Sequence, residues 1–112
     1  MTDFKRQDPR KIYLIEAYNN GVSQYKIGVS IDPKKRYKQH RTSNPNLIGI
    51  IYEYESNWPF KIETALKNSF SHLSIDGEWY DLSYEDVEHF KDICLKTEQN
   101  IELIYNNSTF DF

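Results

Sequence analysis

The sequence of 112 residues contains one cysteine, Cys94, and has no long apolar run. A single cysteine excludes an internal disulfide framework and the common zinc-ligand patterns, and it suits a reducing compartment. No apolar stretch approaches the roughly 18 residues that a membrane span needs. The polar start MTDFKRQDPR also lacks the hydrophobic core of a signal peptide. We therefore expect a soluble, unprocessed cytoplasmic protein that does not act in a membrane.

The chain also lacks repeats, low-complexity segments and linkers. Its length suits one modest core and is too short for two, so a single domain over residues 1–112 is predicted. The core is expected over about residues 11–99, with 1–10 and 100–112 as terminal extensions. A hydrophobic content of 38% and an aromatic content of 15% are typical of a globular chain. One core must therefore carry any functional site.

The net charge of −3 hides an uneven distribution along the chain. Residues 1–72 hold 12 Lys+Arg and 7 Asp+Glu, a net +5, whereas residues 73–112 hold 2 and 10, a net −8. Basic side chains concentrate in residues 25–41, where the only acidic residue is Asp32. Such a patch can bind phosphates, although a lysine run by itself is more often a solvated helix face. The nucleic-acid-binding candidates in this patch are Lys34, Lys35, Lys38 and Arg41.

Three segments have the composition of strands. Residues 11–18 and 25–30 are rich in β-branched and aromatic residues, and the "NNG" between them is a turn signal, so the two predict a hairpin. Residues 46–56 are mostly apolar in their first part and alternate between apolar and polar residues in their second part, which indicates a third strand. The expected sheet is small, antiparallel and three-stranded.

Three helices are expected to flank this sheet, which gives an α+β fold. Asp32 can cap and Pro33 can begin a helix that runs to about Arg41. A second helix is expected from about residue 59, and Ser83 begins a third with a capping-box-like pattern. The second helix has an inward stripe of Ile62, Leu66, Ser69, Phe70 and Leu73, and the third a buried side of Val87, Phe90, Cys94 and Ile101. Residues 76–83 are expected to form a turn and an extended hook, and the tail from residue 100 fits either helix or strand.

Lys26 is a charged residue in a strand that otherwise looks buried. An unpaired buried ammonium costs several kcal/mol, so Lys26 needs a partner or a task. Because neighbours on a strand point to opposite faces, Lys26 and Gly28 share one face. If Tyr13 shares that face, a phenol and an ammonium emerge together, with space left above Gly28.

Three further polar residues could join this pair. Arg36 and His40 are four residues apart on the first helix and therefore share one side of it. Glu63 lies at the border of the apolar stripe of the second helix, where a carboxylate can face a cleft. A carboxylate for a divalent metal, a guanidinium for phosphate and groups that position and deprotonate water are what a phosphodiester hydrolase needs.

The tripeptides "KIY" at residues 11–13 and "KIG" at residues 26–28 resemble the two motifs that name the GIY-YIG nuclease superfamily. The resemblance is to its short single-domain members from phages and large DNA viruses. It continues through "VSIDPKKRYKQHRTSNP", which is similar to the arginine-bearing helix, "IETALKNSF", similar to the glutamate-bearing helix, and "GEWYDLS", similar to the hook that follows. Together these segments cover roughly residues 11–90 in the order of the family.

The resemblance implies a metal-dependent DNA endonuclease that hydrolyses phosphodiester bonds with water as the nucleophile. It assigns Tyr13 to activating or orienting the water, Arg36 to the scissile phosphate, and Glu63 to one Mg²⁺ or Mn²⁺ ion. His40 would bind the nucleophile or its phosphate. Lys26 replaces the usual tyrosine, as in some restriction enzymes of the family, and would stabilise phosphate charge or act on the water.

Two other functions are compatible with the sequence. The same fold without turnover could bind nucleic acid through residues 26–41 or a protein through the acidic residues 76–98. A nuclease acting on RNA is the third possibility. Because no appended DNA-reading domain is visible, we expect either a weak sequence preference or a homodimer or protein partner that supplies one. If the source is viral, the compartment is the host cytoplasm.

Overall fold

The computed structural model describes the backbone of residues 8–109 and the side chains of residues 8–106. Most of the predicted N-terminal extension and the end of the C-terminal one lie outside these residues. Three long antiparallel strands form most of the sheet, namely β1 (Lys11–Asn19), β2 (Val22–Ser30) and β3 (Leu47–Glu55). The predicted hairpin is confirmed: Asn20 and Gly21 join β1 to β2 with φ angles of 51° and 81°. A two-residue hairpin turn needs positive φ at both positions, which Asn and Gly adopt most readily.

The sheet has five strands in the order β3-β1-β2-β5-β4, so the prediction of three was wrong. The two additional strands are β4 (Ser74–Asp76) and β5 (Trp79–Tyr80), which form a short hairpin where the sequence indicated a hook. β5 pairs with β2 at two positions, Tyr25 with Tyr80 and Lys26 with Trp79. Tyr80 is buried in the core, so packing as well as strand pairing attaches the hook to the sheet.

Two of the helices, α1 (Pro33–Ser43) and α3 (Tyr84–Glu88), begin at the predicted capping residues. Asp32 accepts a hydrogen bond from the Lys35 backbone amide at 3.1 Å, and Ser83 and Asp86 form a reciprocal capping box. The predicted third helix is interrupted at His89 and forms two helices, and the ambiguous tail is helical. The remaining helices are α2 (Pro59–Ser69), the 3₁₀ turn η1 (Ser71–Leu73) and α4 (Phe90–Thr109).

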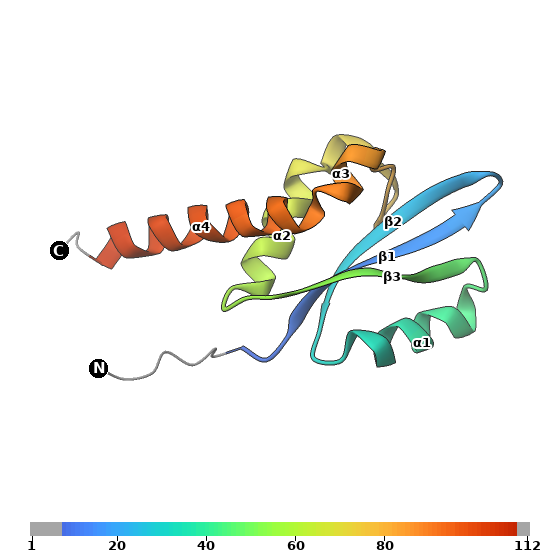
Figure 1. Ribbon diagram of the computed structural model, residues 1–112, viewed down its shortest axis with the longest axis horizontal. Coiled ribbons are helices and arrows are strands. Elements are labelled where there is room, and N and C mark those ends of the chain that lie inside the picture. Colours follow the sequence, from blue (N-terminus) through green and yellow to red (C-terminus); the bar gives the residue numbers. More distant parts are fainter. Residues whose placement is uncertain (1–7, 110–112) are drawn as a thin grey trace.

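The helices cover opposite faces of the sheet (Figure 1). α1 lies against one face, and α2, α3 and α4 lie on the other. β1 serves both cores by alternation: Ile12 and Leu14 pack with α2 and α4, whereas Tyr13 and Ile15 pack on the α1 side with Tyr37. Even and odd residues of one strand therefore belong to two separate apolar clusters.

The predicted inward stripes are confirmed with one exception. Ile62, Leu66, Phe70, Phe90 and Cys94 are buried, and Leu73, Val87 and Ile101 are partly buried against the same cluster. Ser69 is exposed, because the neighbouring Phe70 fills the inward position after Leu66. Burial raises the pKa of Cys94 to about 12, so this thiol remains a protonated core group.

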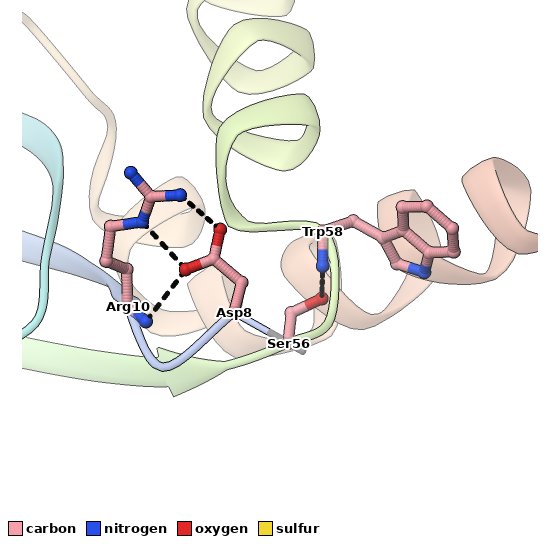
Figure 2. Close-up of polar contacts among 4 residues, drawn as sticks. All are labelled: Asp8, Arg10, Ser56 and Trp58. Carbon is pink, nitrogen blue, oxygen red and sulfur yellow. Dashed lines mark hydrogen bonds and ion pairs between the residues drawn. The ribbon is translucent and has the colours of Figure 1, made fainter. Parts of the chain in front are cut away.

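Glu98 anchors α4 to the sheet and to the turn that begins α2. Its carboxylate accepts hydrogen bonds from the hydroxyl of Tyr54, at 2.8 Å, and from that of Ser56. The Ser56 oxygen in turn accepts a hydrogen bond from the backbone amide of Trp58 (Figure 2). The indole of Trp58 donates a hydrogen bond to Glu102 of α4 at 3.4 Å. In the described part of the chain, no helix combines the length and apolarity needed to cross a membrane.

The segment before β1 is tied to the start of α2. Asp8 accepts two hydrogen bonds from the Arg10 side chain and one from its backbone amide (Figure 2). The guanidinium carbon of Arg10 lies 4.1 Å from the centre of the Phe60 ring. A cation over an aromatic face is an attractive contact, so this segment holds Phe60 in place.

Candidate active site

A cleft of about 300 Å³ opens beside β2, between α1 and α2. All five residues predicted for catalysis line it. They come from both strands of the hairpin and from two helices on opposite faces of the sheet. The five are Tyr13, Lys26, Arg36, His40 and Glu63.

The pairing of the strands explains how these residues converge. Tyr13 lies directly opposite Gly28 in the β1–β2 ladder, so Tyr13 and Lys26 share one face, which meets the condition stated from the sequence. β5 pairs with β2 only at residues 25 and 26, so among residues 8–109 no strand flanks residues 27–30 on that side. Glu63 of α2 lines the cleft at this open stretch of edge.

The Tyr13 ring fills the space above Gly28 that the sequence suggested would be empty. A Cβ atom at residue 28 would lie 2.3 Å from the Cζ and hydroxyl atoms of Tyr13. Tyr13 is only 2% exposed, so the ring has little freedom to move aside. Gly28 therefore serves to seat the phenol at the bottom of the cleft.

Burial raises the pKa of the Tyr13 phenol above its ordinary value of 10. A hydrogen bond and the positive charge of Arg36 lower the pKa, but by less than burial raises it. The phenol is therefore protonated at neutral pH. In this state it can donate a hydrogen bond and orient a ligand, but it is a poor base.

Lys26 has the partner that its burial requires. Its ammonium lies 3.0 Å from the carboxylate of Glu78, in the turn between β4 and β5. The pairing of Trp79 with Lys26 brings the neighbouring Glu78 to this position. The hydrogen bond and charge of Lys26 lower the pKa of Glu78. We did not identify Glu78 from the sequence, although a buried lysine followed later by an acidic hook was a usable signal.

Glu63 is paired with Lys67, one helical turn further along α2. The two charged groups are 3.4 Å apart, and both line the cleft. The sequence analysis identified Glu63 but not Lys67 as a site residue. The spacing of four residues was the available signal, because it places two side chains on the same side of a helix.

The donor set at Glu63 fits a hard divalent cation that retains most of its water. No group of three or more His, Cys, Asp or Glu side chains that could hold a metal occurs among residues 8–106. A single carboxylate in an open polar cleft suits Mg²⁺, which commonly binds one or two carboxylates plus phosphate oxygens and waters. The ammonium of Lys67 shows that a positive charge is accommodated at this carboxylate.

His40 lines the cleft with its Nε2 atom buried and without a hydrogen-bond partner among the described residues. Burial is the main cause that lowers the pKa of His40 from 6.5, and the charges of Lys26 and Arg36 lower it further. The imidazole is therefore neutral at pH 7 and can accept a proton.

We predict that His40 titrates below pH 6.5 in the folded protein. A pKa lower in the folded than in the unfolded state means that protonation favours unfolding, so this contribution to stability is lost as the pH falls below about 6.5. An NMR titration of the imidazole protons, assigned with His40→Gln, measures the value. A pKa at or above 6.5 would contradict the burial of His40 between two cations.

The predicted nucleic-acid-binding residues lie outside the cleft. All four are exposed on α1, which also supplies Arg36 and His40 to the cleft. Arg41 donates a hydrogen bond to the hydroxyl of Tyr37 at 3.3 Å. We call this surface the basic face of α1; it consists of Lys34, Lys35, Lys38 and Arg41.

Comparison with known proteins gives one match. Searches of the curated proteins and of the solved structures found nothing similar to the chain. Residues 10–95 match the T5orf172 domain, which includes β1, β2, β3, α1, α2 and the β4–β5 hairpin with all the cleft residues named above. This family is nuclease-associated and indicates a nuclease-like or DNA-binding role, without specifying the reaction. The match covers well over half of the sequence, so the chain belongs to the T5orf172 domain family.

Proposed function

We propose that the protein is a metal-dependent DNA endonuclease of the GIY-YIG type, which hydrolyses phosphodiester bonds with water as the nucleophile. The observation that carries this proposal is that Tyr13, Lys26, Arg36, His40 and Glu63 line one cleft. These residues are spread over half of the chain, and a sheet with a helix on each side brings them together.

The charge of the cleft suits a phosphodiester. Three cationic side chains, Lys26, Arg36 and Lys67, face two carboxylates, Glu63 and Glu78, which leaves a net +1 with His40 neutral. Arg36 is suited to the scissile phosphate because a guanidinium can donate two parallel hydrogen bonds to its oxygens. Lys26 adds a point charge from the floor of the cleft and stabilises the charge that develops in the transition state.

The two neutral polar groups of the cleft, Tyr13 and His40, have different roles toward the attacking water. Tyr13, protonated and held over Gly28, donates a hydrogen bond that orients the nucleophile. His40 is the base, because its imidazole is neutral and its Nε2 has no partner among the described residues. Water attacks phosphorus as the bond from phosphorus to the leaving sugar oxygen breaks, so the reaction takes one step and no covalent intermediate with the protein forms. The proton of the water passes to His40, and the leaving oxygen takes a proton from solvent.

Glu63 holds one Mg²⁺ or Mn²⁺ ion in this proposal. When bound, such an ion supplies charge neutralisation at the phosphate and lowers the pKa of a bound water. Glu63 has to exchange the ammonium of Lys67 for the ion, and the 3.4 Å separation of this partly exposed pair makes the exchange inexpensive.

The basic face of α1 gives the DNA backbone a path to the cleft. α1 lies on the opposite face of the sheet from α3 and α4, which belong to the strongly acidic part of the chain (Figure 1). The basic and acidic surfaces are thus separated in space. DNA that approaches along α1 meets the exposed lysines first and then Arg36.

Plasmid cleavage in Mg²⁺ or Mn²⁺ tests the proposal, with Arg36→Ala and Lys34→Ala as a matched pair on α1. We expect Arg36→Ala to reduce cleavage by about 100-fold or more, because it removes a contact to the transition state. Lys34→Ala lies outside the cleft and is expected to weaken DNA binding a few-fold and to reduce its salt dependence. Equal effects of the two substitutions on cleavage would contradict the assigned role of Arg36.

A second candidate is a binding module without turnover. The observation in its favour is that both cleft carboxylates are already paired with lysines, Glu63 with Lys67 and Glu78 with Lys26. DNA binding without cleavage at any concentration of either metal would support the module. Cleavage of single-stranded RNA without cleavage of plasmid would redirect the proposal to an RNA nuclease.

A further inference from the structure

The two partners of the Lys26–Glu78 ion pair differ sharply in their surroundings. The Lys26 side chain is 10% exposed, whereas that of Glu78 is 69% exposed. Both line the cleft, and their charged groups are 3.0 Å apart. An ammonium that is nearly buried keeps its counter-charge from a side chain that is mostly in solvent.

The backbone around the two residues differs in the same way. Lys26 lies within the nine-residue strand β2 and is paired with Ile15 on one side and Trp79 on the other. Glu78 lies in a tight turn after Gly77, which has a φ of 69°, and the strand that follows has two residues. The lysine is therefore fixed by the sheet, and the glutamate can leave with a change of side-chain rotamer.

We propose that Glu78 is a displaceable counter-ion, which occupies the position of a DNA phosphate on Lys26 until DNA binds. The inference rests on the proposed function in that its ligand is DNA. A phosphate that reaches Lys26 and Arg36 must take the place of the Glu78 carboxylate or lie beside it. Displacement breaks an ion pair and close approach adds repulsion, so Glu78 weakens DNA binding by either route. Glu78 thus sets the affinity of the cleft for the DNA backbone.

Binding of a fluorescein-labelled 20-bp duplex in EDTA, followed by anisotropy, tests this inference without requiring cleavage. Glu78→Gln is compared with Asp76→Asn, which removes the same charge from an exposed position in the same hairpin but outside the cleft. We expect Glu78→Gln to bind roughly 2- to 5-fold more tightly than Asp76→Asn, in the range measured for ion pairs with solvent-exposed groups. The gain is expected to shrink when Lys26→Met is present in both proteins, because the ion pair is then absent and only the repulsion between Glu78 and the phosphate remains.

Three outcomes would overturn the inference. Equal affinities of Glu78→Gln and Asp76→Asn would show that any gain comes from the change in the net charge of the protein and not from the position of Glu78. Weaker binding by Glu78→Gln, with thermal unfolding unchanged, would make Glu78 a residue that orients Lys26. A failure of both the wild type and Glu78→Gln to bind DNA would show that DNA is not the ligand of the cleft. If the affinity gain is seen in a protein that never cleaves DNA, the counter-ion role stands and the endonuclease proposal fails.

Discussion

Glu63→Gln is expected to abolish metal-dependent cleavage while leaving DNA binding intact. The substitution keeps the shape of the side chain but removes the one carboxylate assigned to the metal. Loss of a metal contribution of several kcal/mol corresponds to about a thousand-fold or more in rate, at about 1.4 kcal/mol for each factor of ten. Binding should persist or increase, because the cleft gains one unit of positive charge. Loss of cleavage together with retained binding separates a catalytic role from a structural one.

The matched control for this substitution is Thr64→Ala, at the exposed neighbouring position on α2. Both variants are expected to unfold near the wild-type temperature, since a helical ion pair at a spacing of four residues, such as the partly exposed Glu63–Lys67 pair, contributes only about 0.3–0.5 kcal/mol. Initial nicking rates of supercoiled plasmid over a range of Mg²⁺ and Mn²⁺ concentrations measure the effect. Cleavage by Glu63→Gln at the rate of Thr64→Ala would remove Glu63 from the mechanism.

The placement of several cleft residues can be predicted from the sequence, because it depends on side-chain alternation along strands and on residue spacing along helices. The turn at residues 19–21 sets the hairpin register, and the register together with the pleat places Tyr13 beside Lys26. The spacing of Arg36 and His40 puts both on one side of α1. The border of the apolar stripe is a position from which Glu63 can face a cleft, and the resemblance to the nuclease motifs singled it out from other helix carboxylates. Each of these inferences uses a period of two or of 3.6 residues.

The parts that sequence did not reveal depend on long-range pairing. β5 has two residues, too few for an alternating pattern, and its partner in β2 lies more than fifty residues earlier. Without that pairing neither the fourth and fifth strands nor the contact of Glu78 with Lys26 can be derived. The division of the predicted third helix at His89 was also missed, because the buried positions on both sides keep one helical spacing.

Gly28→Ala is expected to damage both the stability and the activity of the protein. The new methyl group would lie 2.3 Å from two atoms of the Tyr13 ring and 2.8 Å from a third. Because Tyr13 is 2% exposed, the ring can yield only by disturbing the cluster that contains Ile15 and Leu47. Overpacking of this kind costs about 1–3 kcal/mol. The displaced phenol would also leave its position in the cleft, so cleavage should fall by about 100-fold as well.

Gly49→Ala is the matched control for that substitution. Gly49 lies in β3 of the same sheet, and a Cβ built there meets no atom within 4 Å. Urea unfolding should therefore leave Gly49→Ala at or slightly above wild-type stability, since an alanine at a compatible position restricts the unfolded chain. Tyr13→Phe separates the two effects of Gly28→Ala, because it keeps the ring in the core and removes only the hydroxyl. If Gly28→Ala matches Gly49→Ala in stability, the ring of Tyr13 does not rest on residue 28 in solution. Tyr13→Phe would then decide by itself whether the phenol takes part in cleavage.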